Sequence, residues 1–152
     1  MAGYFFDTSA LVKLYHQEIG TIIVEQIART ADTRVLISRL ACAELISAFA
    51  IKVRTVAMDR ADVGLLLLQF REDIASGKLD VFSIGESEFS DTERLVECYG
   101  LVLRLRALDA LQLAVARELR NQKRVDHFVA ADRILCEVAA MEGFAVINPG
   151  LS

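Results

Sequence analysis

The chain has 152 residues, of which 54% are hydrophobic, a size and apolar content that suit one domain with a buried core. No apolar run reaches the roughly 18–20 residues of a membrane-spanning helix, and no signal-like segment opens the sequence, so we expect a cytoplasmic protein without a membrane partner. The net charge of −4 excludes binding of nucleic acid through bulk charge, and three scattered cysteines and two isolated histidines argue against a zinc ribbon or a Ser-His-Asp triad.

Short apolar runs alternate with segments of helical periodicity, which predicts an α/β fold with a parallel sheet and helices on both faces. The expected strands span residues 4–6, 34–38, 79–82, 126–130 and 145–147. The expected helices span residues 8–15, 18–29, 39–56, 59–75, 85–99, 104–121 and 133–142. Glycines 77, 100 and 143 are expected to end three of these helices.

Two aspartates follow predicted strands in the same way. Asp7 comes directly after the apolar residues 4–6, and Asp132 follows residues 128–131, and a helix is expected after each. Carboxyl ends of parallel strands meet at one rim of a sheet, where ligands bind in open α/β folds. Each aspartate alone is explained equally well as a helix N-cap, a role that is compatible with catalysis.

Two further acids interrupt apolar helical runs. Glu44 lies within residues 40–46 and Asp109 within residues 105–111. Because an unpaired buried carboxylate is costly, each is expected to have a partner or a solvated position. For Asp109 the partner on the same helical face is Arg106, three residues earlier.

The four acids are expected to meet at one rim, because Glu44 and Asp109 fall in early turns of helices that start there. Four carboxylates repel one another unless cations neutralise them, and all-oxygen ligands select Mg²⁺ or Mn²⁺. Such a site activates water and stabilises the leaving oxygen of a phosphodiester. We expect the hydroxyls of Thr8 and Ser9 to orient a carboxylate or a metal-bound water.

Five blocks of the sequence resemble PIN-domain proteins, and among them the VapC-type toxins of bacterial toxin–antitoxin pairs. The blocks are Asp7-Thr8-Ser9-Ala10-Leu11, Ala43-Glu44, Leu108-Asp109-Ala110-Leu111-Gln112-Leu113-Ala114, Phe128-Val129-Ala130-Ala131-Asp132-Arg133-Ile134-Leu135 and Gly143-Phe144-Ala145-Val146-Ile147-Asn148-Pro149. The resemblance covers essentially the whole chain. It implies a single domain over residues 1–152, an α/β/α sandwich with a mostly parallel five-stranded sheet.

The resemblance also implies a metal-dependent ribonuclease that acts on RNA, forms a homodimer and is silenced by a cognate antitoxin protein. The family's acids carry over onto Asp7, Glu44, Asp109 and Asp132 as catalytic residues and ligands of Mg²⁺ or Mn²⁺, and its hydroxyl carries over onto Ser9. The sequence departs from many relatives in having Gln112 in place of a histidine and Ala130 in place of threonine or serine. Neither departure removes a metal ligand.

RNA phosphates require local positive charge. The basic residues nearest the acidic blocks are Lys13, Arg39, Arg104 and Arg106. Residues 46–54 and 63–70 carry more apolar side chains than one helix face needs, which is consistent with core, with a dimer interface or with a groove for an antitoxin helix.

Three other interpretations were weighed. A haloacid dehalogenase-type phosphatase requires a second acid where Ser9 stands, and a response-regulator receiver requires an early acidic pair and a late lysine that the chain lacks. The alternative from another class is a PIN-like module that binds RNA or a protein without cutting. The presence of all four acids favours the nuclease.

Overall fold

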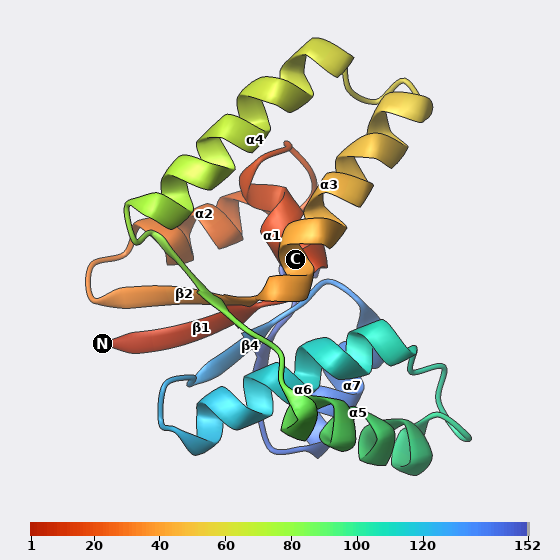
Figure 1. Ribbon diagram of the computed structural model, residues 1–152. Coiled ribbons are helices and arrows are strands. Elements are labelled where there is room, and N and C mark those ends of the chain that lie inside the picture. The colour runs from red at the N-terminus through yellow and green to blue at the C-terminus, as the bar shows by residue number, and fades with distance from the viewer. Residues whose placement is uncertain (152) are drawn as a thin grey trace.

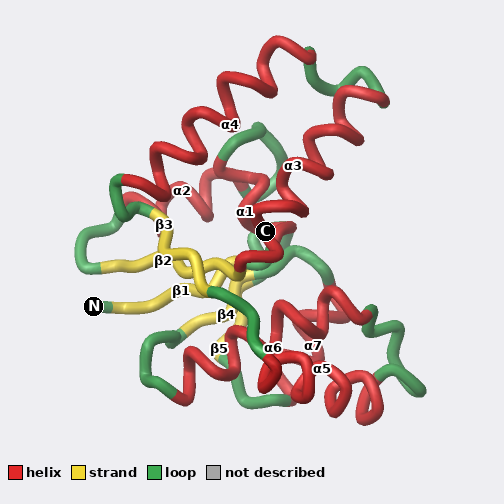
Figure 2. The backbone as a smooth tube through the Cα atoms, in the orientation of Figure 1, coloured by secondary structure: helices red, strands yellow, loops and turns green. Residues whose placement is uncertain are grey.

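Five parallel strands form the sheet at the centre of the computed structural model, which describes residues 1–151. Their order is β3-β2-β1-β4-β5, and Figure 2 shows them in yellow. The strands are β1 (Ala2–Phe6), β2 (Thr33–Ser38), β3 (Leu79–Phe82), β4 (His127–Val129) and β5 (Ala145–Ile147). The predicted strands and the predicted fold class are confirmed, with strand ends moved by at most two residues.

The helices follow the predicted order. They are α1 (Thr8–Leu11) with a 3₁₀ turn η1 (Val12–Leu14), α2 (Thr21–Arg29), α3 (Arg39–Arg54), α4 (Arg60–Ala75), α5 (Glu86–Tyr99), α6 (Ala107–Asn121) and α7 (Arg133–Met141). Gly77 and Gly143 follow α4 and α7 with φ of 83° and 90°, the left-handed conformation that ends a helix at low cost.

Two predicted helices begin three residues later than expected. Residues 104–106 do not join α6, because Leu105 is buried in the core between the exposed Arg104 and Arg106. Helix α2 begins at Thr21 rather than Glu18, since Gly20 holds a φ of 93°. A Cβ at Gly20 would lie 2.2 Å from the carbonyl oxygen of Pro149, so this turn requires glycine.

Helices cover both faces of the sheet, with α1–α4 on one side and α5–α7 on the other (Figure 1). Alternate strand residues supply the two cores. Phe5, Leu36 and Phe128 pack with α5–α7, whereas their neighbours Phe6 and Val129 pack with α1–α4. Burial of both faces is typical of an all-parallel sheet and explains the near-continuous apolar strands.

The hairpin of α3 and α4 extends away from the sheet (Figure 1). Large apolar side chains remain exposed along it, namely Ile46, Ile51, Leu65 and Leu68. Part of the apolar excess predicted for residues 46–54 and 63–70 is therefore surface, while Phe49 and Phe70 are core. Within residues 1–151 no helix is long and apolar enough to cross a membrane.

Candidate active site

The candidate site lies at the carboxyl rim of the sheet, where the neighbouring strands β1 and β4 end. The chain leaves β1 toward helices on one face, and it leaves β4 toward α7 on the other. Strands whose connections run to opposite faces leave a crevice at their carboxyl ends. Asp7 follows β1, Asp132 caps α7, Glu44 lies in the second turn of α3 and Asp109 in the first turn of α6.

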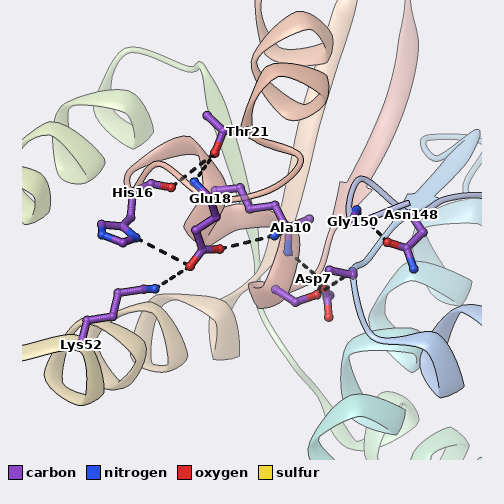
Figure 3. Close-up of polar contacts among 11 residues, drawn as sticks. Asp7, Ala10, His16, Glu18, Thr21, Lys52, Asn148 and Gly150 are labelled. Atoms are coloured by element: carbon purple, nitrogen blue, oxygen red, sulfur yellow. Dashed lines mark hydrogen bonds and ion pairs between the residues drawn. The ribbon is translucent and has the colours of Figure 1, made fainter. Parts of the chain in front are cut away.

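Asp7 is almost fully buried, with 4% of its surface exposed. Its Oδ1 accepts hydrogen bonds from the Ser9 hydroxyl (2.6 Å) and from the backbone N–H of Ala10 (3.1 Å; Figure 3). Ser9 Oγ also accepts the N–H of Ala131 (2.8 Å), which joins the end of β1 to the segment after β4. The predicted N-cap role of Asp7 and the orienting role of Ser9 are therefore both present in the geometry.

Burial raises the pKa of Asp7 to about 7, although the hydrogen bonds from Ser9 and Ala10 act in the opposite direction. The negative charges of Asp109 and Glu44 raise this pKa further. The three carboxylates are thus close enough to influence one another electrostatically, as expected for residues that share one rim.

Glu44 is held by two donors on a single oxygen. Its Oε1 accepts from the Thr8 hydroxyl (2.7 Å) and from Gln112 Nε2 (2.9 Å). Gln112 Nε2 also donates to Thr8 Oγ1 (3.1 Å), while Gln112 Oε1 accepts from the Ser38 hydroxyl (2.7 Å). The expected orienting role of the hydroxyls is thus divided, with Ser9 on Asp7 and Thr8 on Glu44.

Arg106 bridges the other two acids. Its Nε donates to Asp109 Oδ2 (3.1 Å), and its Nη2 lies 3.7 Å from Asp132 Oδ2. Asp132 Oδ1 caps α7 by accepting the N–H of Leu135 (2.9 Å). Burial raises the pKa of Asp109, the neighbouring Arg106 lowers it, and Asp132 and Glu44 raise it. The simpler explanations for these acids therefore both apply, a salt bridge for Asp109 and a helix cap for Asp132.

Asp7, Glu44 and Asp109 each have one oxygen held by the protein, whereas both oxygens of Asp132 have a partner. Within residues 1–151, no hydrogen bond or ion pair involves Asp7 Oδ2, Glu44 Oε2 or Asp109 Oδ1. Likewise, no three His, Cys, Asp or Glu side chains of this part of the chain are grouped closely enough to hold a metal ion. The four carboxylates therefore do not converge on one ion position as expected. Each is held instead by a helix N–H, a hydroxyl or an arginine.

One basic residue proposed for the substrate is not available. Lys13 is only 7% exposed and its Nζ lies 3.4 Å from Glu18 Oε1, so this candidate is not free to contact RNA. Glu18 also pairs with Lys52 and lies near His16 (Figure 3). By contrast, Arg39 and Arg104 are exposed and take part in no ion pair within the described residues.

Sequence reasoning missed the bond between Ser38 and Gln112. Ser38 also caps α3, because its hydroxyl oxygen accepts the N–H of Ala41 (3.3 Å). The available signal was the single polar side chain in the otherwise apolar, fully buried run 110–116. A buried amide in such a run needs hydrogen-bond partners, and here they lie on three other elements.

Comparisons with known proteins agree with this fold. Residues 4–141 match the sequence model of the family described as PIN domain. The search of curated proteins found no match.

Similar solved structures include a toxin–antitoxin complex from Klebsiella pneumoniae, with 15% identity, 96% of this chain and 97% of that chain covered, and a TM-score of 0.62. The sarcin-ricin-loop-cleaving toxin VapC20 of Mycobacterium tuberculosis has 15% identity, coverage of 96% and 99%, and a TM-score of 0.67. FitAcB of Neisseria gonorrhoeae has 16% identity, coverage of 98% and 99%, and a TM-score of 0.63. At these identities the likeness concerns the fold.

Proposed function

Because the chain belongs to the PIN-domain family, whose members are generally nucleases, we propose that it is an endoribonuclease dependent on Mg²⁺ or Mn²⁺ and the toxin of a toxin–antitoxin pair. The observation that carries this proposal is the set of half-paired acids at the rim. Asp7, Glu44 and Asp109 each keep one oxygen fixed by the protein and one without a partner in residues 1–151. Hard divalent cations prefer such carboxylate oxygens.

The residues of the site have different roles in the proposed reaction. Asp7, Glu44 and Asp109 would hold the cation, together with Asp132. Ser9 fixes Asp7 against β4, and Thr8 fixes Glu44. A bound Mg²⁺ or Mn²⁺ supplies activation of water and neutralises charge that develops on the phosphate oxygens.

The RNA contact is assigned to exposed arginines at the same rim. Arg39 begins α3 and Arg106 caps α6, the helices that carry Glu44 and Asp109. Arg104 lies two residues before Arg106 and is exposed. The planar guanidinium group of arginine binds two phosphate oxygens at once. These arginines therefore supply a local positive charge that the overall net charge of −4 does not provide.

The antitoxin is assigned to the groove between α3 and α4. This groove has a volume of about 420 Å³ and is lined by Arg39, Cys42, Ala43, Ile46, Leu67, Phe70, Arg71 and Ile74. An amphipathic helix with acidic side chains at its edges suits such an apolar groove with arginines beside it. The groove adjoins Glu44 on α3, so an antitoxin helix bound in it would lie beside the candidate active site. A homodimer is the assembly that the family resemblance implies.

The test is cleavage by the purified chain, free of antitoxin, on a panel of RNAs with Mg²⁺ or Mn²⁺. We expect cleavage that EDTA abolishes and that Asp7→Asn and Asp109→Asn each lower at least 100-fold, in line with the loss of a metal ligand. Glu72→Gln, an exposed acid on α4, is the matched control and should cleave as the wild type does. Metal-independent cleavage, or full activity in both variants, contradicts the proposal. RNA binding without cleavage across the panel favours the alternative, a non-cleaving PIN-like module.

A further inference from the structure

Two adjacent apolar residues are exposed at the tip of the segment that joins α5 to α6. Leu101 is 91% exposed and Val102 is 84% exposed. Within residues 1–151, no other two consecutive large apolar side chains are both exposed. Figure 1 shows that this segment extends outward from the helices. Exposed apolar side chains that lie together mark a surface for interaction with a partner.

Backbone contacts determine the shape of this tip. The carbonyl oxygen of Tyr99 accepts the N–H groups of Val102 (3.2 Å) and Leu103 (2.7 Å). A Cβ at Gly100 would lie 2.6 Å from the carbonyl oxygen of Val96, so the turn requires glycine. Immediately after the tip, the side chain of Leu103 packs against the core. The tip is therefore a formed apolar protrusion, and a partner that binds it does not first have to order the chain.

Two arginines connect the tip to the candidate active site. Residues 100–106 include Arg104 and Arg106 and contain no acidic residue. Arg104 is exposed and takes part in no ion pair within the described residues. Arg106 reaches the acids of the rim, Asp109 and Asp132. A chain that runs from the rim to the tip therefore meets positive charge first and apolar side chains next.

This combination of charge and apolar surface suits RNA. Arginine binds phosphate oxygens, whereas apolar side chains insert between nucleobases and contact their flat faces. In duplex RNA the bases are paired and stacked, and the groove that displays them is deep and narrow, so a protein contacts base faces mainly in unpaired segments. A second copy of this chain could also cover an apolar tip, but such a contact gives no reason for two arginines on the same segment.

We infer that Leu101 and Val102 contact unpaired bases of an RNA whose phosphates lie on Arg104 and Arg106. This inference rests on the proposed function and deepens it, because it assigns the substrate class as RNA with a single-stranded segment. Aliphatic side chains have no hydrogen-bonding group for the edge of a base, so the tip selects for unpaired structure and not for a particular base. The contact involves no metal ion and can be measured without one.

The experiment measures binding of fluorescent RNA to the full chain, purified without antitoxin, by anisotropy in EDTA. Two RNAs of the same sequence are compared, one single-stranded and one duplex. Leu101→Ser combined with Val102→Ser should weaken binding of the single strand about 5–30-fold, because apolar burial is lost. Binding of the duplex should stay within twofold. The matched control combines Leu65→Ser with Leu68→Ser, two exposed leucines of α4, and should bind both RNAs as the wild type does.

The dependence of binding on salt separates the apolar contact from the contact to phosphate. The double variant of the tip should keep the wild-type slope of log Kd against log salt concentration. Arg104→Gln should instead reduce this slope by about one, as expected when one phosphate contact is removed.

Three results would overturn the inference. If the wild type binds the single strand and the tip variant binds it within twofold, the inference fails while the nuclease proposal stands. Equal weakening for single strand and duplex shows that the tip does not contact unpaired bases. If RNA binding is unchanged but the tip variant dissociates a dimer in analytical ultracentrifugation, the tip covers a second copy instead. A wild type that binds neither RNA overturns both this inference and the assignment of RNA to the exposed arginines.

Discussion

Capping and metal binding do not compete for the same atom of Asp7. The cap of α1 uses Oδ1, which accepts from Ala10 and Ser9, while Oδ2 has no partner in residues 1–151. A single aspartate can therefore end a strand, start a helix and still offer an oxygen at the rim. The cost is a buried charge, which is expressed in the raised pKa of Asp7.

Replacing Asp7 by asparagine is expected to stabilise the protein at high pH. The asparagine oxygen can still accept from Ser9 and Ala10, so the cap survives while the charge is lost. Because folding raises the pKa from 3.8 to about 7, the protonated carboxyl favours the folded state fully below pH 3.8, and this contribution is lost as the pH rises to about 7. The variant should gain on the order of 2–4 kcal/mol at pH 8 and almost nothing at pH 4. Urea denaturation in EDTA at the two pH values measures this difference, and an equal gain at both contradicts the explanation.

The sequence located the four acids at the rim better than it located their partners. Asp7 and Asp132 follow strands, and Glu44 and Asp109 interrupt apolar runs, so local pattern alone singles them out. Partners are set by tertiary contacts between distant residues, which no local pattern contains. The pairing of Lys13 could not be predicted for this reason, since Lys13, Glu18 and Lys52 meet only after η1 and the segment before α2 have packed against α3.

At the scale of elements, prediction succeeded where periodicity was unambiguous and failed at residues 104–106. A charged-apolar-charged triplet fits a helix as well as an extended segment, and only burial of Leu105 in the core decides between them. This error affects the site, because the extended segment makes Arg106 the cap of α6 and brings it to Asp109 and Asp132.

Glu142, the residue that ends α7, joins the three helices α5–α7 on one face of the sheet. Its carboxylate accepts from Arg94 on α5 (2.7 Å), from Tyr99 on α5 and from Arg117 on α6. Asp91 on α5 also pairs with Arg117 (2.7 Å). Because α6 carries Asp109 and Gln112, this network helps to determine where α6 lies relative to the rim.

Glu142→Gln is expected to destabilise the fold by roughly 1.5–3 kcal/mol at pH 7, the range for hydrogen bonds to charged groups. Burial alone would raise the pKa of Glu142, but the hydrogen bonds from Tyr99 and Arg94 and the charge of Arg117 lower it overall. Its stabilising contribution is therefore present above its ordinary pKa of 4.5 and is lost as the pH falls below that value. Thermal unfolding at pH 7 and pH 3.5 should show a large difference from wild type and then a small one. Glu97→Gln, an exposed acid on α5, should behave as wild type at both.

At the scale of the whole molecule, a parallel sheet explains how acidic residues and arginines from distant parts of the chain reach one rim, as the proposed action on RNA requires. All five strands point the same way, so residues 7, 44, 109 and 132 reach one rim from distant parts of the chain. The same topology brings the starts of α3 and α6, with Arg39 and Arg106, to that rim. In the proposed function, affinity for phosphate would depend on these local arginines and on a cation rather than on the net charge of −4.

Stabilisation of the fold by Mn²⁺ is expected to increase with pH. A cation on Asp7 must displace the proton that burial retains there, and with a pKa of about 7 this competition is strong at pH 6 and weak at pH 8. Apparent affinity should therefore tighten up to about tenfold between these values, which adds about 1.4 kcal/mol of stabilisation when the ion is in excess. Differential scanning fluorimetry should show a Mn²⁺-induced rise in Tm that is about 3–6 °C larger at pH 8 than at pH 6. In Asp7→Asn, which lacks both this ligand and its titrating proton, the Mn²⁺-induced rise in Tm should be small at both pH values. A rise in Tm that is equal at both pH values in the wild type would show that no proton on Asp7 competes with the ion.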